Sequence, residues 1–129
     1  MEITSWQENG KTPVAVLQLK GDLAAEEALE ARARIVFADG ARNIVLDLSG
    51  VPYISSAGLR AIHAVYMMLR NADAGETSTA RGIASGTYKS PHLKLVKPSK
   101  NAMKALSTAG YDMFLEIHDT VKSAVQSFG

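Results

Sequence analysis

The chain has 129 residues, a common size for one folded domain and too short for two ordinary ones. Hydrophobic residues make up 47% and charged residues 21%, which is typical of a globular protein and excludes a disordered chain. The net charge of +1 and the absence of cysteine exclude a global attraction to nucleic acid, a disulfide framework and thiolate chemistry.

The first half of the chain predicts a hairpin followed by a central strand. An Asn-Gly pair at 9–10 separates two strand-forming runs, residues 2–8 and 13–19, which favours an antiparallel hairpin. Residues 44–48 form a short and almost continuous apolar run. Such a run is typical of a strand that is covered on both faces, so we expect it at the centre of the sheet.

Two helical segments flank this central strand. The first is predicted to be capped by Asp22 and to end at Gly40, and the second is predicted to begin near Ser55 and Ser56. In each segment the apolar residues share one helical face, which a sheet can bury. They are Leu29, Ala33, Val36 and Phe37 in the first segment, and Leu59, Ile62, Val65, Tyr66 and Leu69 in the second.

The remaining chain predicts a loop and four further elements. Residues 73–91 have no periodicity and are rich in Ala, Gly, Ser and Thr, so we expect a flexible insertion loop on the surface. After it the sequence predicts a strand at 93–96, a helix capped by Ser99 and reaching Ala109 with Met103 and Leu106 inward, a strand at 113–117 and a terminal helix capped by Asp119. The fold class is therefore α/β: a layered domain with about four helices and a mixed, mostly parallel sheet after the opening hairpin.

Candidates for catalysis or metal binding are weak. His63, His92 and His118 lack the spacing of a helical metal pair, so we expect no metal. Ser56 and His63 are seven helical positions apart, roughly 10 Å, which is too far for a Ser–His pair. Glycines in the 73–91 segment do not match a phosphate-binding loop. We expect no catalytic residue and no cofactor.

Nucleic acid and membrane are also not expected as direct partners. The lysines between residues 89 and 104 are interpreted as a solvated face, and aromatic residues do not interleave with them. No stretch approaches 18 apolar residues, and the N-terminus has no apolar region of the kind found in secretory signals. A cytoplasmic location is the resulting expectation.

The most informative stretch is Ile44–Arg60, IVLDLSGVPYISSAGLR, which combines a buried strand, a turn and a helix start. Its Asp-Leu-Ser step and its Ser-x-Gly-Leu step resemble the STAS domain family, found in bacterial anti-sigma factor antagonists and in some transporter tails. Leu19–Leu23, LKGDL, resembles the turn before the first helix of that family. The resemblance implies a single STAS-like domain over residues 1–129.

The resemblance also implies a site. In antagonists of this family an anti-sigma factor that is itself a serine kinase phosphorylates one serine, and the matching position here is Ser56. Ser55 stands where the family usually has Asp, and Ala57 follows the acceptor. The residues expected to bind the partner are Gly21, Asp22, Tyr53, Ile54, Ser55, Gly58, Leu59 and Arg60.

Three hypotheses for function follow. In the first, the chain is a partner switch that binds the kinase and releases it when Ser56 carries a phosphate, which a helix N-terminus tolerates; a serine phosphatase is a further partner. In the second, the two serines are structural, Ser55 as the N-cap and Ser56 as the first helical residue, roles worth about 1 kcal/mol, and the chain is a STAS subunit of a lipid- or anion-transport complex. The third is a small enzyme with residues 73–91 as a lid. The oligomeric state is left open.

Overall fold

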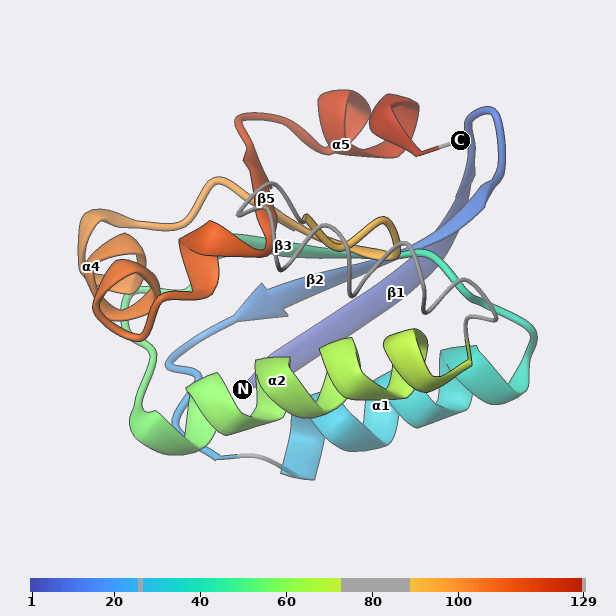
Figure 1. Ribbon diagram of the computed structural model, residues 1–129. Helices are drawn as coiled ribbons and strands as arrows, with labels where there is room; N and C mark the ends of the chain where they lie inside the picture. Colours follow the sequence, from blue (N-terminus) through green and yellow to red (C-terminus); the bar gives the residue numbers. More distant parts are fainter. Residues whose placement is uncertain (26, 73–88, 129) are drawn as a thin grey trace.

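A five-stranded mixed sheet is the centre of the computed structural model, which describes residues 1–25, 27–72 and 89–128 (Figure 1). The strands are β1 (Glu2–Asn9), β2 (Pro13–Lys20), β3 (Ile44–Gly50), β4 (Leu93–Val96) and β5 (Glu116–His118), and they lie side by side in that order. β1 pairs antiparallel with β2, and all the other neighbours are parallel. The predicted hairpin, the mostly parallel sheet and the central position of β3 are confirmed.

Helices cover both faces of the sheet. In the described residues they are α1 (Glu27–Ala38), α2 (Ser56–Asn71), α4 (Lys100–Thr108) and α5 (Val121–Ser127), with a 3-10 helix, η1, at Tyr111–Met113. α1 and α2 lie beneath one face, α5 lies over the other, and α4 lies at the edge where the parallel strands end (Figure 1). None of the helices formed by these residues is long and apolar enough to cross a membrane.

The two faces of β3 belong to two separate cores. Ile44, Leu46 and Leu48 are fully buried in the larger core, which α1 and α2 close. Val45 is buried in the smaller core, where Phe128 packs at the end of α5. Because successive side chains of a strand alternate between its faces, a strand covered on both sides needs an apolar residue at nearly every position. This explains the continuous apolar run in the sequence.

Two of the predicted helix caps are wrong. α1 begins at Glu27, so Asp22 lies too far upstream to cap it; the chain first runs extended and Leu23 bridges to Ile54. At α5 the cap is Thr120 in place of Asp119, and the Thr120 hydroxyl accepts from the Ser123 N–H at 3.0 Å. Both helix starts depend on where the preceding segment is held, which the local sequence does not show.

The last third of the chain differs in two further details. The final strand begins at Glu116 and not at Met113, because Gly110 (φ 81°) turns the chain into η1 first. The Ser99 cap of α4 is confirmed: its hydroxyl accepts from the Ala102 N–H at 3.1 Å. On that helix Leu106 is buried as expected, whereas Ala102 takes the inward position that was predicted for Met103, which is half-buried.

The expected loop at 73–91 falls mostly outside the described residues, which resume at Lys89. Its end is part of the folded structure. Ser90 is buried, and its N–H donates to the Phe114 carbonyl at 2.8 Å. The flexible loop predicted from composition therefore does not extend through Ser90.

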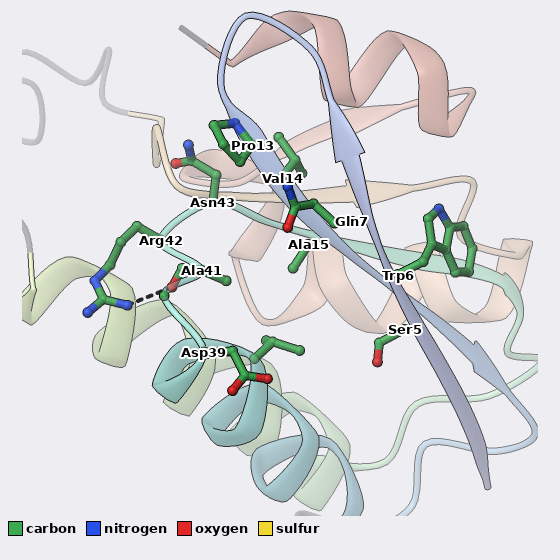
Figure 2. Close-up of a pocket in the computed structure, with 12 residues that line it drawn as sticks. Ser5, Trp6, Gln7, Pro13, Val14, Ala15, Asp39, Ala41, Arg42 and Asn43 are labelled. Atoms are coloured by element: carbon green, nitrogen blue, oxygen red, sulfur yellow. Dashed lines mark hydrogen bonds between the residues drawn. The ribbon is translucent and has the colours of Figure 1, made fainter.

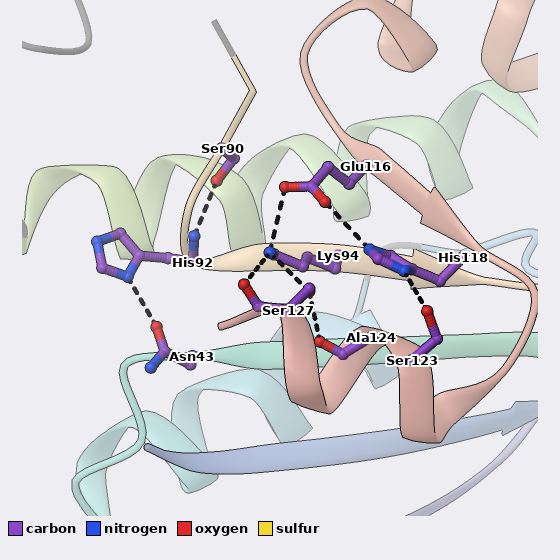
Figure 3. Close-up of polar contacts among 9 residues, drawn as sticks. All are labelled: Asn43, Ser90, His92, Lys94, Glu116, His118, Ser123, Ala124 and Ser127. Carbon is purple, nitrogen blue, oxygen red and sulfur yellow. Dashed lines mark hydrogen bonds and ion pairs between the residues drawn. The ribbon is translucent and has the colours of Figure 1, made fainter. Parts of the chain in front are cut away.

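The α5 face of the sheet contains a buried cation (Figure 3). Lys94 Nζ lies 3.1 Å from a Glu116 oxygen and donates to the Ser127 hydroxyl at 2.8 Å. The other Glu116 oxygen accepts from His118 Nε2 at 3.1 Å, and His118 Nδ1 lies 2.9 Å from the Ser123 hydroxyl. These contacts tie α5 to β4 and β5 through polar groups, in addition to the small apolar core.

The exposure of the two ion-pair partners differs, since 4% of the Lys94 side chain and 35% of the Glu116 side chain are exposed. We expect Glu116→Gln to lower the free energy of unfolding by about 1–3 kcal/mol, because it leaves a buried ammonium without its counter-charge. Lys94→Met should cost less, since Glu116 can be hydrated. Urea unfolding of both variants measures this, and an equal or reversed order would contradict it.

Candidate functional site

Two loops that follow neighbouring strands lie against each other, and together they form what we call the loop pair, residues 21–25 and 51–55. The Leu23 N–H donates to the Tyr53 carbonyl, and the Ser55 N–H donates to the Leu23 carbonyl, both at 2.9 Å. These bonds form a parallel bridge between Leu23 and Ile54 beyond the ends of β2 and β3. The structure therefore brings together the two separate stretches of sequence that were predicted to form the site.

Ser55 has a structural role at the start of α2. Its backbone is extended (φ −83°, ψ 174°), and its hydroxyl accepts from the Gly58 N–H at 3.1 Å. The same hydroxyl donates to the Leu23 carbonyl at 3.3 Å. Ser55 is thus the N-cap of α2 and also a link between this helix and the other half of the loop pair.

Gly58 allows α2 to approach this closely. A Cβ at this position would lie 2.2 Å from the Leu23 carbonyl oxygen and 2.9 Å from Leu23 Cγ, which no real contact allows. Gly58 and Ile54 are buried, so these two predicted binding residues lie beneath the surface and hold the loop pair together. Leu59 and Gly21 are half-buried.

The exposed residues of the predicted site are Asp22, Tyr53, Ser56 and Arg60, and we call them the Ser56 face. Ser56 is the first residue of α2, one position after the cap. Its hydroxyl has no hydrogen-bond partner in the part of the chain that the structure describes. Tyr53 is 51% exposed, which is unusual for a large aromatic side chain. This face therefore combines a free hydroxyl, both signs of charge and an aromatic ring.

Two residues that sequence analysis did not assign to the site support it from the last third of the chain. The Ser99 hydroxyl donates to the Pro52 carbonyl at 3.3 Å, and the Tyr111 hydroxyl donates to the Leu59 carbonyl at 2.9 Å. Burial raises the pKa of Tyr111 above 10.0, and the nearby Arg60 partly offsets this. The sequence predicted Ser99 as a helix cap but gave no indication that it would bond to Pro52, and it gave no signal for Tyr111.

The three histidines are not brought together. His63 is exposed on α2 with its ring 5.9 Å from that of Tyr66, whereas His92 Nδ1 lies 2.8 Å from the Asn43 amide oxygen at the other end of β3. His118 belongs to the cluster under α5. Among the described residues, no three side chains of the metal-binding types form a group that could hold an ion.

A cavity of about 520 Å³ lies under the hairpin, between the start of β2 and the end of α1 (Figure 2). Its lining includes Ser5, Gln7, Ala15 and Asp39, and none of the predicted site residues. Arg42, which also lines it, donates to the Ala41 carbonyl at 2.9 Å. The cavity is at the opposite end of the parallel strands from Ser56, so the Ser56 face is no part of its wall.

Comparisons with known proteins agree with this architecture. Residues 5–75 match the family model described as STAS domain. No curated protein matches the chain in sequence.

Several solved structures with the same fold are described as anti-sigma factor antagonists. A candidate antagonist from Thermotoga maritima has a TM-score of 0.67 at 22% identity, over 96% of this chain and 92% of that one. An antagonist from Mycobacterium paratuberculosis has a TM-score of 0.66 at 22% identity, over 98% and 93%. The antagonist SpoIIAA, in its unphosphorylated form, has a TM-score of 0.59 at 14% identity, over 95% and 92%. At these identities the likeness shows the fold.

The two adjacent serines should respond differently to removal of the hydroxyl. Ser55→Ala removes the cap of α2 and the link to Leu23, so we expect it to lower the free energy of unfolding by about 1–2 kcal/mol. Ser56→Ala removes an exposed hydroxyl without a described partner, and we expect a change within about 0.5 kcal/mol. Chemical denaturation measures both values. Equal losses in the two variants would contradict the assignment of the cap to Ser55.

Gly58→Ala tests the close approach of α2 to the loop pair. The added methyl group would meet the Leu23 carbonyl oxygen, so the helix or the loop must move, and we expect a loss of at least about 2 kcal/mol. Amide NMR signals of Leu23 and Tyr53 should shift, since their hydrogen bond lies beside the clash. A variant as stable as the wild type with unchanged signals would show that the contact is not restrictive.

Proposed function

Because this chain belongs to the STAS domain family, we propose that it is a regulatory binding protein of the anti-sigma factor antagonist kind. The proposed partner is an anti-sigma factor that is also a serine kinase, which the chain binds in its unphosphorylated form. Phosphorylation of Ser56 ends this interaction, and a serine phosphatase restores it. The proposed location is the cytoplasm. The solved structures that share the fold, which are described as antagonists, support this proposal.

The observation that carries the proposal is the division of roles between the two serines. Ser55 holds the start of α2 through two hydrogen bonds, whereas Ser56 presents a hydroxyl without a described partner to solvent. A phosphate on Ser56 therefore need not break a contact of the folded domain. It would lie near the first N–H groups of α2, where a negative charge is favourable.

The modification is an ordinary phosphoryl transfer from ATP. The Ser56 oxygen forms a bond to the γ-phosphorus while the bond from that phosphorus to the bridging oxygen breaks. ADP leaves, and the hydroxyl proton passes to the base of the kinase. An exposed serine beside a fixed helix start offers the kinase an acceptor whose position is set by the Ser55 cap.

Loss of binding follows from the new charge. The phosphate adds about −1.5 to −2 charge to the Ser56 face, next to the exposed Tyr53. A partner that buries this face would have to desolvate the phosphate or meet it with a cation, and either requirement weakens a complex formed with the bare hydroxyl. The fold itself is unchanged, so the switch is reversible.

Binding of a purified anti-sigma factor serine kinase from the same host tests the proposal. We expect Ser56→Glu to weaken binding at least about tenfold, Ser56→Ala to bind like the wild type, and ATP to add one phosphate to the wild type and none to Ser56→Ala. Titration calorimetry and intact-mass spectrometry provide the readouts.

The control is Gln126→Glu, which adds a negative charge to an exposed position on α5, over the other face of the sheet. It should bind like the wild type. Equal affinities for the wild type and Ser56→Glu would overturn the proposal. If a transport ATPase or permease bound both forms equally, the chain would be a subunit of a lipid- or anion-transport complex with Ser56 as a structural residue.

A further inference from the structure

We propose that Arg60 is a positioning residue for the phosphorylated state, in which its guanidinium pairs with the phosphate on Ser56. The inference rests on the proposed phosphorylation of Ser56 and names the side chain that binds the phosphate once it is attached. It concerns the chain alone, so it can be tested without any partner protein.

The spacing of the two residues on α2 carries the argument. α2 runs without interruption from Ser56 to Asn71, and Arg60 follows Ser56 by four positions, about one helical turn. Residues four apart lie on the same face of a helix, and both of these side chains are exposed. An anion that precedes a cation by four positions is the more favourable order on a helix. The geometry thus places a guanidinium within reach of a phosphate on the Ser56 oxygen.

The chemistry of the two groups fits. Arginine presents a planar set of donors that binds two phosphate oxygens at once, which a lysine at the same position would not do. Arg60 itself is exposed, so its guanidinium can reach a phosphate at the surface. The Tyr111 hydroxyl is committed to the Leu59 carbonyl and adds no negative charge there.

The other charged groups near Ser56 come from neighbouring elements. The first turn of α2 contains no acidic residue. The loop before α1 contributes the exposed carboxylate of Asp22, which would repel a phosphate. α4 contributes Lys100, next to the Ser99 cap that bonds to Pro52. Arg60 is the cation on the same helix face as the phosphate, so we expect it to make the largest contribution.

Pairing between the phosphate and Arg60 would add a second effect of phosphorylation, beside the added negative charge. When the phosphate engages Arg60, the Ser56 face gains a negative group and one of its cations is drawn to that group at the same time. A glutamate at position 56 has one charge and fewer acceptor oxygens, so it should engage Arg60 more weakly. Substitution by an acidic residue therefore supplies the negative charge on which the binding test depends, but reproduces only part of the contact with Arg60.

The test is a ³¹P NMR titration of the full chain with phosphoserine installed at position 56 during synthesis. A cation that binds the dianion lowers the second pKa of the phosphate. We expect this pKa to rise by about 0.5 unit in Arg60→Gln and to recover only in part in Arg60→Lys, which keeps the charge but not the paired donors. It should stay unchanged in the control Lys104→Gln, which replaces an exposed lysine on α4.

A phosphate pKa that is the same with Arg60 and with Arg60→Gln would overturn the inference, and so would an equal rise in Lys104→Gln. High salt should reduce the difference between the wild type and Arg60→Gln, because the pair is exposed. The outcome is independent of the binding experiment above. A chain that binds no kinase contradicts the proposed function, whereas the phosphate titration alone decides the pairing with Arg60.

Discussion

The close contact between Gly58 and the Leu23 carbonyl sets how α2 meets the rest of the domain. Any side chain at position 58 would collide with that carbonyl oxygen, at 2.2 Å for a Cβ, so the helix can sit against the first loop only with glycine there. The contact places Ser55 where its hydroxyl can bond to both Leu23 and Gly58. Once Ser55 is turned inward in this way, the next residue, Ser56, is left on the outside.

The two hydrophobic cores hold this arrangement in place. The larger core fixes α1 and α2 under the sheet, and the smaller core fixes α5 over it, with the buried Lys94 supplying polar links to the helix. The last third of the chain then reaches back to the site, since Ser99 bonds to Pro52 and Tyr111 bonds to Leu59. The start of α2 is therefore held from three sides, by the loop pair, by α4 and by η1.

A support of this kind suits the proposed switch, which is based on charge. The structure needs no rearrangement to present Ser56, and a phosphate on it would change the properties of the Ser56 face without changing the fold beneath. Arg60, one turn further along α2, offers a counter-charge within the chain itself. The cavity under the hairpin lies at the other end of the parallel strands and is separate from this face.

The sequence by itself determined the hairpin, the central strand, the amphipathic course of α2 and the cap at Ser99, because each depends on periodicity or on a turn within a few residues. It also placed Ser56 at a helix start. Only the tertiary structure decided that the Ser55 hydroxyl also bonds to Leu23 and that Gly58 is buried against Leu23. Those outcomes depend on which distant backbone groups are brought within hydrogen-bond distance, and that is set by the packing of the sheet and its helices, which no local pattern records.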